Sequence, residues 1–270
     1  MTDATARAQA RPGPAQMRLD GRVALVTGAA GKLGPVWCAA LAQAGATVIG
    51  LDLAAGSPPD DVERLLQADV TDRGSLRRAR EALTAELGAP SVLVNGAGID
   101  QPPDAAARTY RVEDIPADQF RATLDVNLVG TFQAIQVFGA AMRDAGGGSI
   151  VNVGSLYASL APRPELYDHL EADPPFLKPP AYGASKAGVI SLTRYFARLW
   201  GPHGVRVNAL SPGGVRGGQD PEFTAKYCEH VPLGRMAEPD DLAAPLVFLA
   251  SDASRYVTGQ ELRVDGGFAV

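Results

Sequence analysis

The sequence predicts an α/β fold in which one doubly wound parallel sheet carries helices on both faces. Short apolar, β-branched runs recur along the chain, segments with helical periodicity alternate with them, and glycine or acidic residues end several of the runs. Apolar runs without polar alternation are typical of strands buried on both faces, and strands that alternate with helices form right-handed βαβ units. The 270 residues contain neither a linker nor an internal repeat, so a single domain is expected.

Each predicted strand is a short apolar run of the kind found in a buried sheet. Residues 22–27 (RVALVT) run into glycines, and residues 47–51 end at Asp52. The strands are expected, in chain order, at residues 22–27, 47–51, 67–69, 92–94, 150–153, 205–210 and 261–264.

The predicted helices have apolar residues at helical spacing and are bounded by glycine or proline. The first helix stops at Gly45, and the long helix within residues 115–143 begins near Pro116 and stops at the glycine run 146–148. The helices are expected, in chain order, near residues 37–44, 62–66, 75–87, 116–143, 182–199 and 242–249.

Composition limits the partners and the location. A formal net charge of −5 gives no electrostatic reason to expect nucleic acid or an anionic membrane, and no metal site is indicated. No apolar run reaches the ~20 residues that a membrane helix needs. Two cysteines, Cys38 and Cys228, read as unbridged thiols in a reducing cytoplasm. Residues 1–17 lack the apolar core of a signal peptide and predict a mobile tail before a domain at 18–270.

A nucleotide site is indicated between the first strand and the first helix. Gly28, Gly31 and Gly34 have G-x-x-G-x-x-G spacing there. Glycines let the backbone approach a pyrophosphate, and a helix N-terminus offers free N–H groups; the alternative is an ordinary strand–helix turn. Asp52 stands near the ~20-residue offset at which an acid binds ribose hydroxyls and would repel a 2′-phosphate, which favours NAD. Lys32 is the argument for NADP, and Asp52 could instead cap the next turn.

Tyr182 and Lys186 are four residues apart, and on a helix they lie on one face. An ammonium near a phenol favours the phenolate and lowers a pKa that is about 10 in water. Such a phenol can exchange a proton with a carbonyl or alcohol oxygen near neutral pH. Y-x-x-x-K alone is common, so its meaning depends on the nucleotide site and on a second hydroxyl.

A set of short motifs runs from residue 21 to residue 270. They are Thr27-Gly28-Ala-Ala-Gly31-Lys-Leu-Gly34, Asp69-Val70, Asn95-Gly96-Ala97-Gly98, Asn127, Ser155, Tyr182-x-x-x-Lys186, Ser211-Pro212-Gly213, and Val257-Thr258-Gly259-Gln260 through Val264-Asp265-Gly266-Gly267. Together they resemble the short-chain dehydrogenase/reductase family. The resemblance implies a Rossmann-type sheet of about seven strands, a nicotinamide cofactor and an alcohol or carbonyl substrate. It also implies a homotetramer or homodimer with closed symmetric interfaces.

The resemblance implies a catalytic set of four residues. Tyr182 would be the proton donor and acceptor, and Lys186 would lower its pKa and bind the nicotinamide ribose. Ser155 would hold the substrate oxygen, and Asn127 would brace a water that relays protons to Lys186. Each has a structural alternative: Asn127 in a helix kink, Ser155 in a strand-end turn, Lys186 as a solvated side chain.

The cofactor residues follow from the same resemblance. Asp69 and Val70 would hold the adenine, and residues 95–98 would lie under the adenosine ribose. The residues expected to contact the cofactor are Gly28, Gly31, Lys32, Leu33, Gly34, Asp52, Asp69, Val70, Asn95, Ala97, Gly98, Tyr182, Lys186, Pro212, Gly213 and Val215.

The chain departs from the family pattern at three places that bear on function. The glycine spacing resembles that of the epimerase-like branch, and Gly217 stands where a threonine is common. Ser155 and Tyr182 are 27 positions apart, about twice the family spacing, and the extra residues 161–180 hold six prolines. That proline content predicts a stiffened loop beside the active site, whose polar groups line a site for a hydroxyl-rich substrate, face solvent, or face a neighbouring subunit. The polar groups are Glu165, Tyr167, Asp168, His169, Glu171, Asp173 and Lys178.

These observations favour an NAD-dependent oxidoreductase that interconverts a secondary alcohol and a ketone. The substrate class is a sugar, a polyol or a cyclic alcohol, the first by weak similarity to a bacterial subgroup that modifies sugars and surface polysaccharides. The alternatives are a non-catalytic NAD-binding regulator and an epimerase or dehydratase that retains its cofactor.

Overall fold

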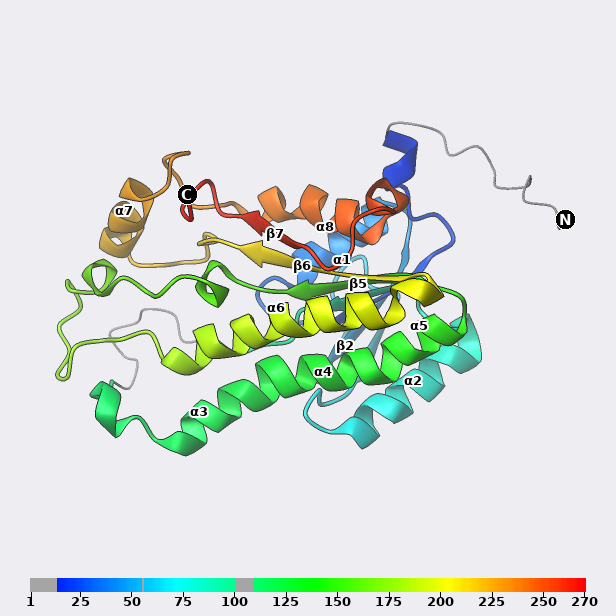
Figure 1. The fold of residues 1–270 in the computed structure, drawn as a ribbon, viewed down its shortest axis with the longest axis horizontal. Helices are drawn as coiled ribbons and strands as arrows, with labels where there is room; N and C mark the ends of the chain where they lie inside the picture. The colour runs from blue at the N-terminus through cyan, green and yellow to red at the C-terminus, as the bar shows by residue number, and fades with distance from the viewer. Residues whose placement is uncertain (1–13, 55, 101–108) are drawn as a thin grey trace, which may run out of the picture.

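A single sheet of seven parallel strands organises the computed structural model, which describes residues 14–54, 56–100 and 109–270. The strand order is β3-β2-β1-β4-β5-β6-β7 (Figure 1). The first three strands are therefore added toward one edge of the sheet and the next four toward the other, and the change occurs between β1 and β4. This confirms the predicted doubly wound fold and places a ligand-binding switch point at the carboxyl ends of β1 and β4. The strands are β1 (Val23–Thr27), β2 (Thr47–Asp52), β3 (Arg64–Gln67), β4 (Val92–Asn95), β5 (Gly148–Val153), β6 (Val205–Pro212) and β7 (Glu261–Val264).

Helices cover both faces of the sheet, which explains why its strands read as unbroken apolar runs (Figure 1). On β1, Leu25 belongs to a core with α2, the long central helix and α6, whereas Ala24 and Val26 belong to a core with α1 and α8. The α-helices outside the long one are α1 (Gly34–Gln43), α2 (Arg73–Leu87), α6 (Pro180–Trp200), α7 (Pro221–Glu229) and α8 (Ala243–Ala250).

The long helix predicted within residues 115–143 is continuous from 117 to 144, and two π turns interrupt its α-helical hydrogen bonding. π turns inside helices are frequently found at functional sites, and the first of these carries Asn127. The segments are α3 (Ala117–Leu124), a π turn (Asp125–Val129), α4 (Gly130–Ala134), a second π turn (Ile135–Gly139) and α5 (Ala140–Asp144).

Two secondary-structure predictions were wrong. Residues 62–66 do not form a helix, because β3 begins at Arg64 and pairs along its length with β2. The N–H of Glu63 already donates to the carbonyl oxygen of Val48 at 2.9 Å, so sheet pairing overrides local helix propensity. Helix α7 was not predicted, since its nine residues carry a weak apolar pattern behind Asp220 and Pro221.

One predicted segment, the N-terminal tail, falls partly outside the described residues. Of the expected tail, residues 1–13 lie outside them, while Pro14–Met17 form a 3-10 turn and Met17 packs against the core of α1 and α8.

Both thiols are free: Cys38 is buried and Cys228 half-buried. In the part of the chain that is described, no helix combines the length and the apolar character that crossing a bilayer requires.

The proline-rich segment 161–180 forms no helix longer than a single 3-10 turn (Pro164–Leu166). It is nevertheless packed, because Leu166, Tyr167 and Phe176 are buried against Phe223 and Tyr227 of α7. These side chains form a third apolar cluster, separate from the two cores that flank the sheet. The insertion and α7 therefore fold together as one unit beyond the strand ends.

Candidate active site

The glycine turn between β1 and α1 leaves no room for side chains. Gly28 has a φ of +71°, and a Cβ there would lie 2.8 Å from the backbone of Ala97. A Cβ on Gly34, at the start of α1, would lie 2.2 Å from the carbonyl oxygen of Ala29. Leu33 caps α1 with no side-chain hydrogen bond, so no side chain of that residue competes for the first-turn N–H groups. The turn fits a pyrophosphate held by backbone N–H groups at a helix N-terminus.

Asp52 joins the glycine turn to the end of β2. Its Oδ2 accepts from the N–H of Ala30 at 2.9 Å, and its Oδ1 accepts from the N–H of Ala54 at 3.2 Å. The side chain therefore caps two turns, which was the alternative to ribose binding. Because each carboxylate oxygen can accept a second hydrogen bond, Asp52 keeps capacity for the ribose hydroxyls of a cofactor. Lys32 in the same turn is exposed.

The predicted adenosine side is built from the ends of β3 and β4. Asp69 Oδ1 accepts from the N–H of Thr71 at 2.8 Å, and Val70 is buried beside Gly130. The N–H groups of Gly96 and Ala97 both donate to the hydroxyl of Thr27 at 3.2 Å.

Asn95 ties the central strands together. Its Nδ2 donates to Asn152 Oδ1 at 2.8 Å, and Asn152 Nδ2 donates to the Thr193 hydroxyl of α6 at 2.9 Å. Asn95 Oδ1 is buried without a hydrogen-bond partner. The segment that follows β4 thus approaches the turn after β1 closely, as a dinucleotide lying across the switch point requires.

Ser155, Tyr182 and Lys186 lie together where β5 ends and α6 begins. The Ser155 hydroxyl hydrogen-bonds the Tyr182 phenol and also accepts from the N–H of Tyr157 at 3.2 Å. Lys186 Nζ lies 5.7 Å from the centroid of the Tyr182 ring and donates to the carbonyl oxygen of Val153 at 2.8 Å. The predicted one-face arrangement of tyrosine and lysine is therefore present.

The charge environment of this group differs from the expectation. Burial raises the pKa of Tyr182 above its usual value, Asp100 acts in the same direction, and the Ser155 hydrogen bond opposes both. Burial lowers the pKa of Lys186 to about 8, and Asp100 opposes that shift. The predicted lowering of the Tyr182 pKa is not found: Lys186 is not among the groups that shift this pKa, and burial raises it more than the Ser155 hydrogen bond lowers it.

Asn127 sits in the first π turn and holds the segment after β4. Its Oδ1 accepts from the N–H of Ile99 at 2.8 Å, and its Nδ2 donates to the Ile99 carbonyl at 3.1 Å and to Ser185 Oγ at 3.1 Å. A Cβ on Gly98 would lie 3.1 Å from Asn127 Oδ1 and 3.7 Å from Lys186 Nζ. The structure thus brings the four predicted catalytic residues to one place, with Asn127 linking three elements.

The remaining predicted cofactor residues lie at the end of β6. The N–H of Gly213, next to Pro212, donates to the Val264 carbonyl at 2.9 Å, and Val215 forms a parallel bridge with Ala237. The N–H of Gly214 donates to the Tyr227 hydroxyl of α7 at 2.6 Å. These contacts connect the predicted nicotinamide side to the unit formed by α7 and the insertion.

The sequence did not predict the ion pair that lies beside Tyr182. Lys178 was noted only as a polar group of the insertion, and Asp100 was not singled out. Lys178 Nζ lies 2.7 Å from Asp100 Oδ1 and 5.0 Å from the centroid of the Tyr182 ring. A cavity of about 370 Å³ bounded by both ends of the insertion reaches Tyr182 and Lys178, but neither Ser155 nor Lys186 lines it. No local sequence signal joins residues 78 positions apart.

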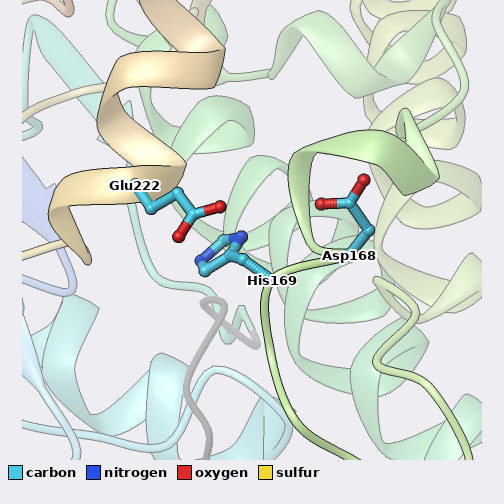
Figure 2. A group of neighbouring side chains, drawn as sticks. All are labelled: Asp168, His169 and Glu222. Atoms are coloured by element: carbon cyan, nitrogen blue, oxygen red, sulfur yellow. The ribbon is translucent and has the colours of Figure 1, made fainter.

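Figure 2 shows a second polar cluster, in which Asp168 and His169 of the insertion face Glu222 of α7. Their potential ligand atoms all lie within 4.8 Å of one another. The Lys226 ammonium bonds both carboxylates and lies 3.4 Å from His169 Nδ1, so the chain itself supplies a cation there. His169 Nε2 lies 3.0 Å from Asp220 Oδ1 without the alignment of a hydrogen bond. The cluster fastens the insertion to α7.

A glycine turn at the switch point of a parallel sheet, together with a buried serine and lysine and a half-buried tyrosine, defines a nicotinamide-dependent oxidoreductase of alcohol and carbonyl groups. A family model described as enoyl-(acyl carrier protein) reductase matches residues 28–269. With this match and the relatives that follow, the chain belongs to the short-chain dehydrogenase/reductase family.

Two similar proteins act on sugar alcohols by name. D-threitol dehydrogenase of Mycolicibacterium smegmatis is 37% identical over 268 residues, which cover 94% of this chain and 95% of that protein. Galactitol 2-dehydrogenase (L-tagatose-forming) of Cereibacter sphaeroides is 39% identical over 267 residues, which cover 94% of this chain and 97% of that protein.

Two similar solved structures carry different cofactors. A short-chain dehydrogenase from Leptospira borgpetersenii with bound NAD+ has a TM-score of 0.82 and 31% identity, and the match covers 99% of this chain and 100% of that one. A gluconate 5-dehydrogenase from Burkholderia cenocepacia in complex with NADP and tartrate has a TM-score of 0.79 and 30% identity, with 94% and 97% covered. The protein is thus an alcohol/ketone oxidoreductase that uses a nicotinamide dinucleotide.

Proposed function

We propose that the protein is an NAD-dependent dehydrogenase that interconverts a secondary alcohol of a polyol or sugar alcohol and the corresponding ketone. The observation that carries this proposal is the hydrogen bond between Ser155 and the Tyr182 phenol, with Lys186 beside them at the strand ends that face the glycine turn. The names of the threitol and galactitol dehydrogenases support the substrate class.

Tyr182 carries the proton in this proposal. When ketone is reduced, its phenol, whose pKa burial raises, holds a proton to give to the carbonyl oxygen while Ser155 donates a hydrogen bond to the same oxygen. When alcohol is oxidised, the phenol must first lose its proton. A bound nicotinamide supplies or accepts the hydride.

Lys186 and Asn127 position and charge this centre. Lys186, with a pKa lowered to about 8 by burial, exchanges protons in the range where a dehydrogenase works, and its ammonium stabilises the phenolate. Asn127 holds Ile99 and Ser185 by its side chain, which fixes the segment after β4 against the helix that carries Tyr182. A water bound near Asn127 as a proton relay stays a prediction.

The preference for NAD rests on Asp52. Its carboxylate ends β2 at the rim of the glycine turn. There it would accept hydrogen bonds from the ribose hydroxyls of a bound cofactor and would repel a 2′-phosphate. Lys32 is one exposed, flexible cation in the same turn and does not outweigh a carboxylate fixed by two backbone N–H groups.

The test is a screen for reduced nicotinamide by absorbance, over threitol, galactitol, other polyols and cyclic alcohols, with NAD+ and NADP+. The proposal expects NADH to accumulate with at least one polyol and more slowly with cyclic alcohols. Product formed without accumulation of NADH would instead indicate the epimerase or dehydratase alternative. Tight NADH binding without turnover of any substrate would indicate a regulator.

We further propose a homotetramer in the cytoplasm. Val129 on the long helix and Tyr195 and Leu199 on α6 are large apolar side chains exposed to solvent, which supports pairing of these helices with their symmetry mates. Light scattering after gel filtration tests the tetramer: a monomer at micromolar concentration overturns it. The cytoplasmic location rests on two free thiols and is tested by fractionation.

A further inference from the structure

We propose that Asp100 and Lys178 are the specificity-determining pair of the substrate site, and that they select an uncharged substrate with adjacent hydroxyl groups over a hydroxy acid. This inference rests on the proposed alcohol dehydrogenase activity of the same site. It explains what the insertion before Tyr182 contributes to the reaction.

Lys178 is held in place at the end of the insertion. Its side chain is only 6% exposed, and its ammonium lies 5.0 Å from the centroid of the Tyr182 ring and 5.4 Å from that of Tyr157. A cation at such distances from two aromatic faces is attracted to both. Pro179 and Pro180 follow directly and restrict the backbone into α6. The insertion therefore delivers one fixed ammonium to the side of the catalytic phenol.

Asp100 reaches the same place from the opposite wall. It follows Ile99, whose N–H and carbonyl are both bound by Asn127, and its Oδ1 lies 2.7 Å from Lys178 Nζ. The Asp100 side chain is 44% exposed, so it is the more accessible member of the pair. The pair bridges the insertion and the segment after β4 beside the ring of Tyr182, and its Lys178 lines the cavity that reaches Tyr182.

The chemistry of the pair matches a diol. An ammonium only donates hydrogen bonds and a carboxylate only accepts them, whereas each hydroxyl of a polyol can do both. Two neighbouring hydroxyls, one accepting from Lys178 and one donating to Asp100, satisfy both partners at once.

The charges of the pair discriminate against acids. Lys178 alone would attract a carboxylate, but Asp100 compensates its charge and is itself the exposed partner. An incoming carboxylate must therefore displace Asp100 from Lys178 or lie beside a like charge, and like-charge contacts are a common basis of specificity. Asp100, more than Lys178, is expected to decide between a polyol and a hydroxy acid.

The experiment compares the kcat/KM for galactitol with that for galactonate, and threitol with threonate, in wild type and in the variants Asp100→Asn and Lys178→Met. Each variant is assayed at its own pH optimum. In Asp100→Asn, kcat/KM is expected to fall about tenfold for the polyol and to rise about tenfold for the acid, which moves the ratio about a hundredfold. In Lys178→Met, the polyol KM is expected to rise about tenfold without any gain for the acid.

Two controls separate this inference from other failures. Lys226→Met removes another ammonium that binds the insertion, at the Asp168 and Glu222 carboxylates, and should leave the ratio unchanged. NADH binding, followed by fluorescence, should be unchanged in every variant, including a second variant, Asp100→Ser, made in case Asp100→Asn does not fold.

The outcomes divide clearly. If wild type oxidises polyols but the ratio stays within threefold in Asp100→Asn or Asp100→Ser, the pair does not set specificity and this inference is overturned. If wild type oxidises no alcohol at all while binding NADH, the proposed function itself is lost. A wild type that prefers the acid over the polyol contradicts the inference directly.

Discussion

The cofactor end and the substrate end of this molecule are built by different physics. At the glycine turn, the backbone itself forms the site: a Cβ on Gly28 or Gly34 would lie 2.8 Å or 2.2 Å from neighbouring backbone atoms. At the insertion, which is proposed to border the substrate, side chains hold the structure in place: an aromatic cluster around Tyr167 and Phe176, and charged contacts to α7 and to Asp100. Backbone geometry suits a nicotinamide dinucleotide, the class of cofactor that the two solved structures described above hold. Side chains on a loop suit a substrate that differs among relatives.

The largest loss of activity is expected when Tyr182 is changed, because this residue acts in the reaction itself. Tyr182→Phe removes the proton carrier while keeping the ring between Ser155 and Lys178, so kcat is expected to fall by about 10³ within the usual range for general acid–base groups. NADH binding, measured by fluorescence titration, should be nearly unchanged. Equal loss of turnover and of NADH binding would show that the phenol holds the cofactor instead.

The next largest effect should come from filling the glycine turn. Gly34→Ala forces a Cβ against the Ala29 carbonyl at 2.2 Å, whereas the matched change Gly31→Ala meets only the Gly28 carbonyl oxygen at 3.2 Å. Overpacking of rigid backbone costs about 1–3 kcal/mol or more, so Gly34→Ala should lower the melting temperature and weaken NADH binding. If both variants bind NADH with wild-type affinity, the absence of a side chain at the glycine turn is not what forms the cofactor site.

Changes in the insertion should affect the KM for the substrate more than the KM for the cofactor. Phe176→Ala removes a buried ring that packs on Tyr167 at a centroid distance of 5.1 Å, and burying such a ring is worth about 3–5 kcal/mol in a full core, less in a small cluster. The KM for the polyol is expected to rise several-fold more than the KM for NAD+. Leu177→Ala, at an exposed neighbouring position, is the control. Equal changes in both KM values would show that the insertion is not part of the substrate site.

A smaller effect is expected at the rim between the two ends. Asp52→Ala removes the carboxylate that is proposed to bind the ribose and should narrow the proposed preference for NAD over NADP by about tenfold, as expected for the loss of one charged contact. Steady-state kinetics with both cofactors measures this ratio. An unchanged ratio would mean that Asp52 only caps the turns through Ala30 and Ala54.

The two ends also differ in how far the sequence predicts them. The strands and the glycine turn follow from local patterns, because burial on both faces and steric exclusion of Cβ atoms leave their marks residue by residue. The proline content indicated a stiff loop but not its packing, since the contacts of Tyr167 and Phe176 with α7 join distant residues. The helix expected at 62–66 failed because β2 offered an edge, a long-range effect.

The candidate catalytic set was predictable as a group but its electrostatics were not. The motifs identified Asn127, Ser155, Tyr182 and Lys186, and the structure brings them together. The direction of the Tyr182 pKa shift depends on how deeply the fold buries the phenol and on Asp100, neither of which a four-residue spacing contains.

The smallest predicted effect concerns pH and uses the residue where the two ends meet. Around Tyr182, burial, Asp100 and Tyr157 raise the phenol pKa and the Ser155 hydrogen bond lowers it, while the ammonium groups of Lys178 and Lys186 lie near the ring. Asp100 also raises the pKa of Lys186, against the larger effect of burial. Removing this negative charge by Asp100→Asn therefore lowers both pKa values.

Alcohol oxidation requires Tyr182 without its proton and Lys186 with its charge. Because the pKa of the phenol is raised while that of Lys186 is about 8, kcat/KM is expected to rise with pH up to the pKa of Lys186, where the two ionisations begin to cancel, and to fall only above the pKa of the phenol. Both limbs of the profile are expected to move to lower pH in Asp100→Asn, and the charge-conserving variant Asp100→Glu should keep the wild-type profile. A shift of either limb to higher pH would mean that Asp100 acts through packing and not through its charge. In that case the charge of Lys178 alone, and not that of Asp100, would set the substrate preference.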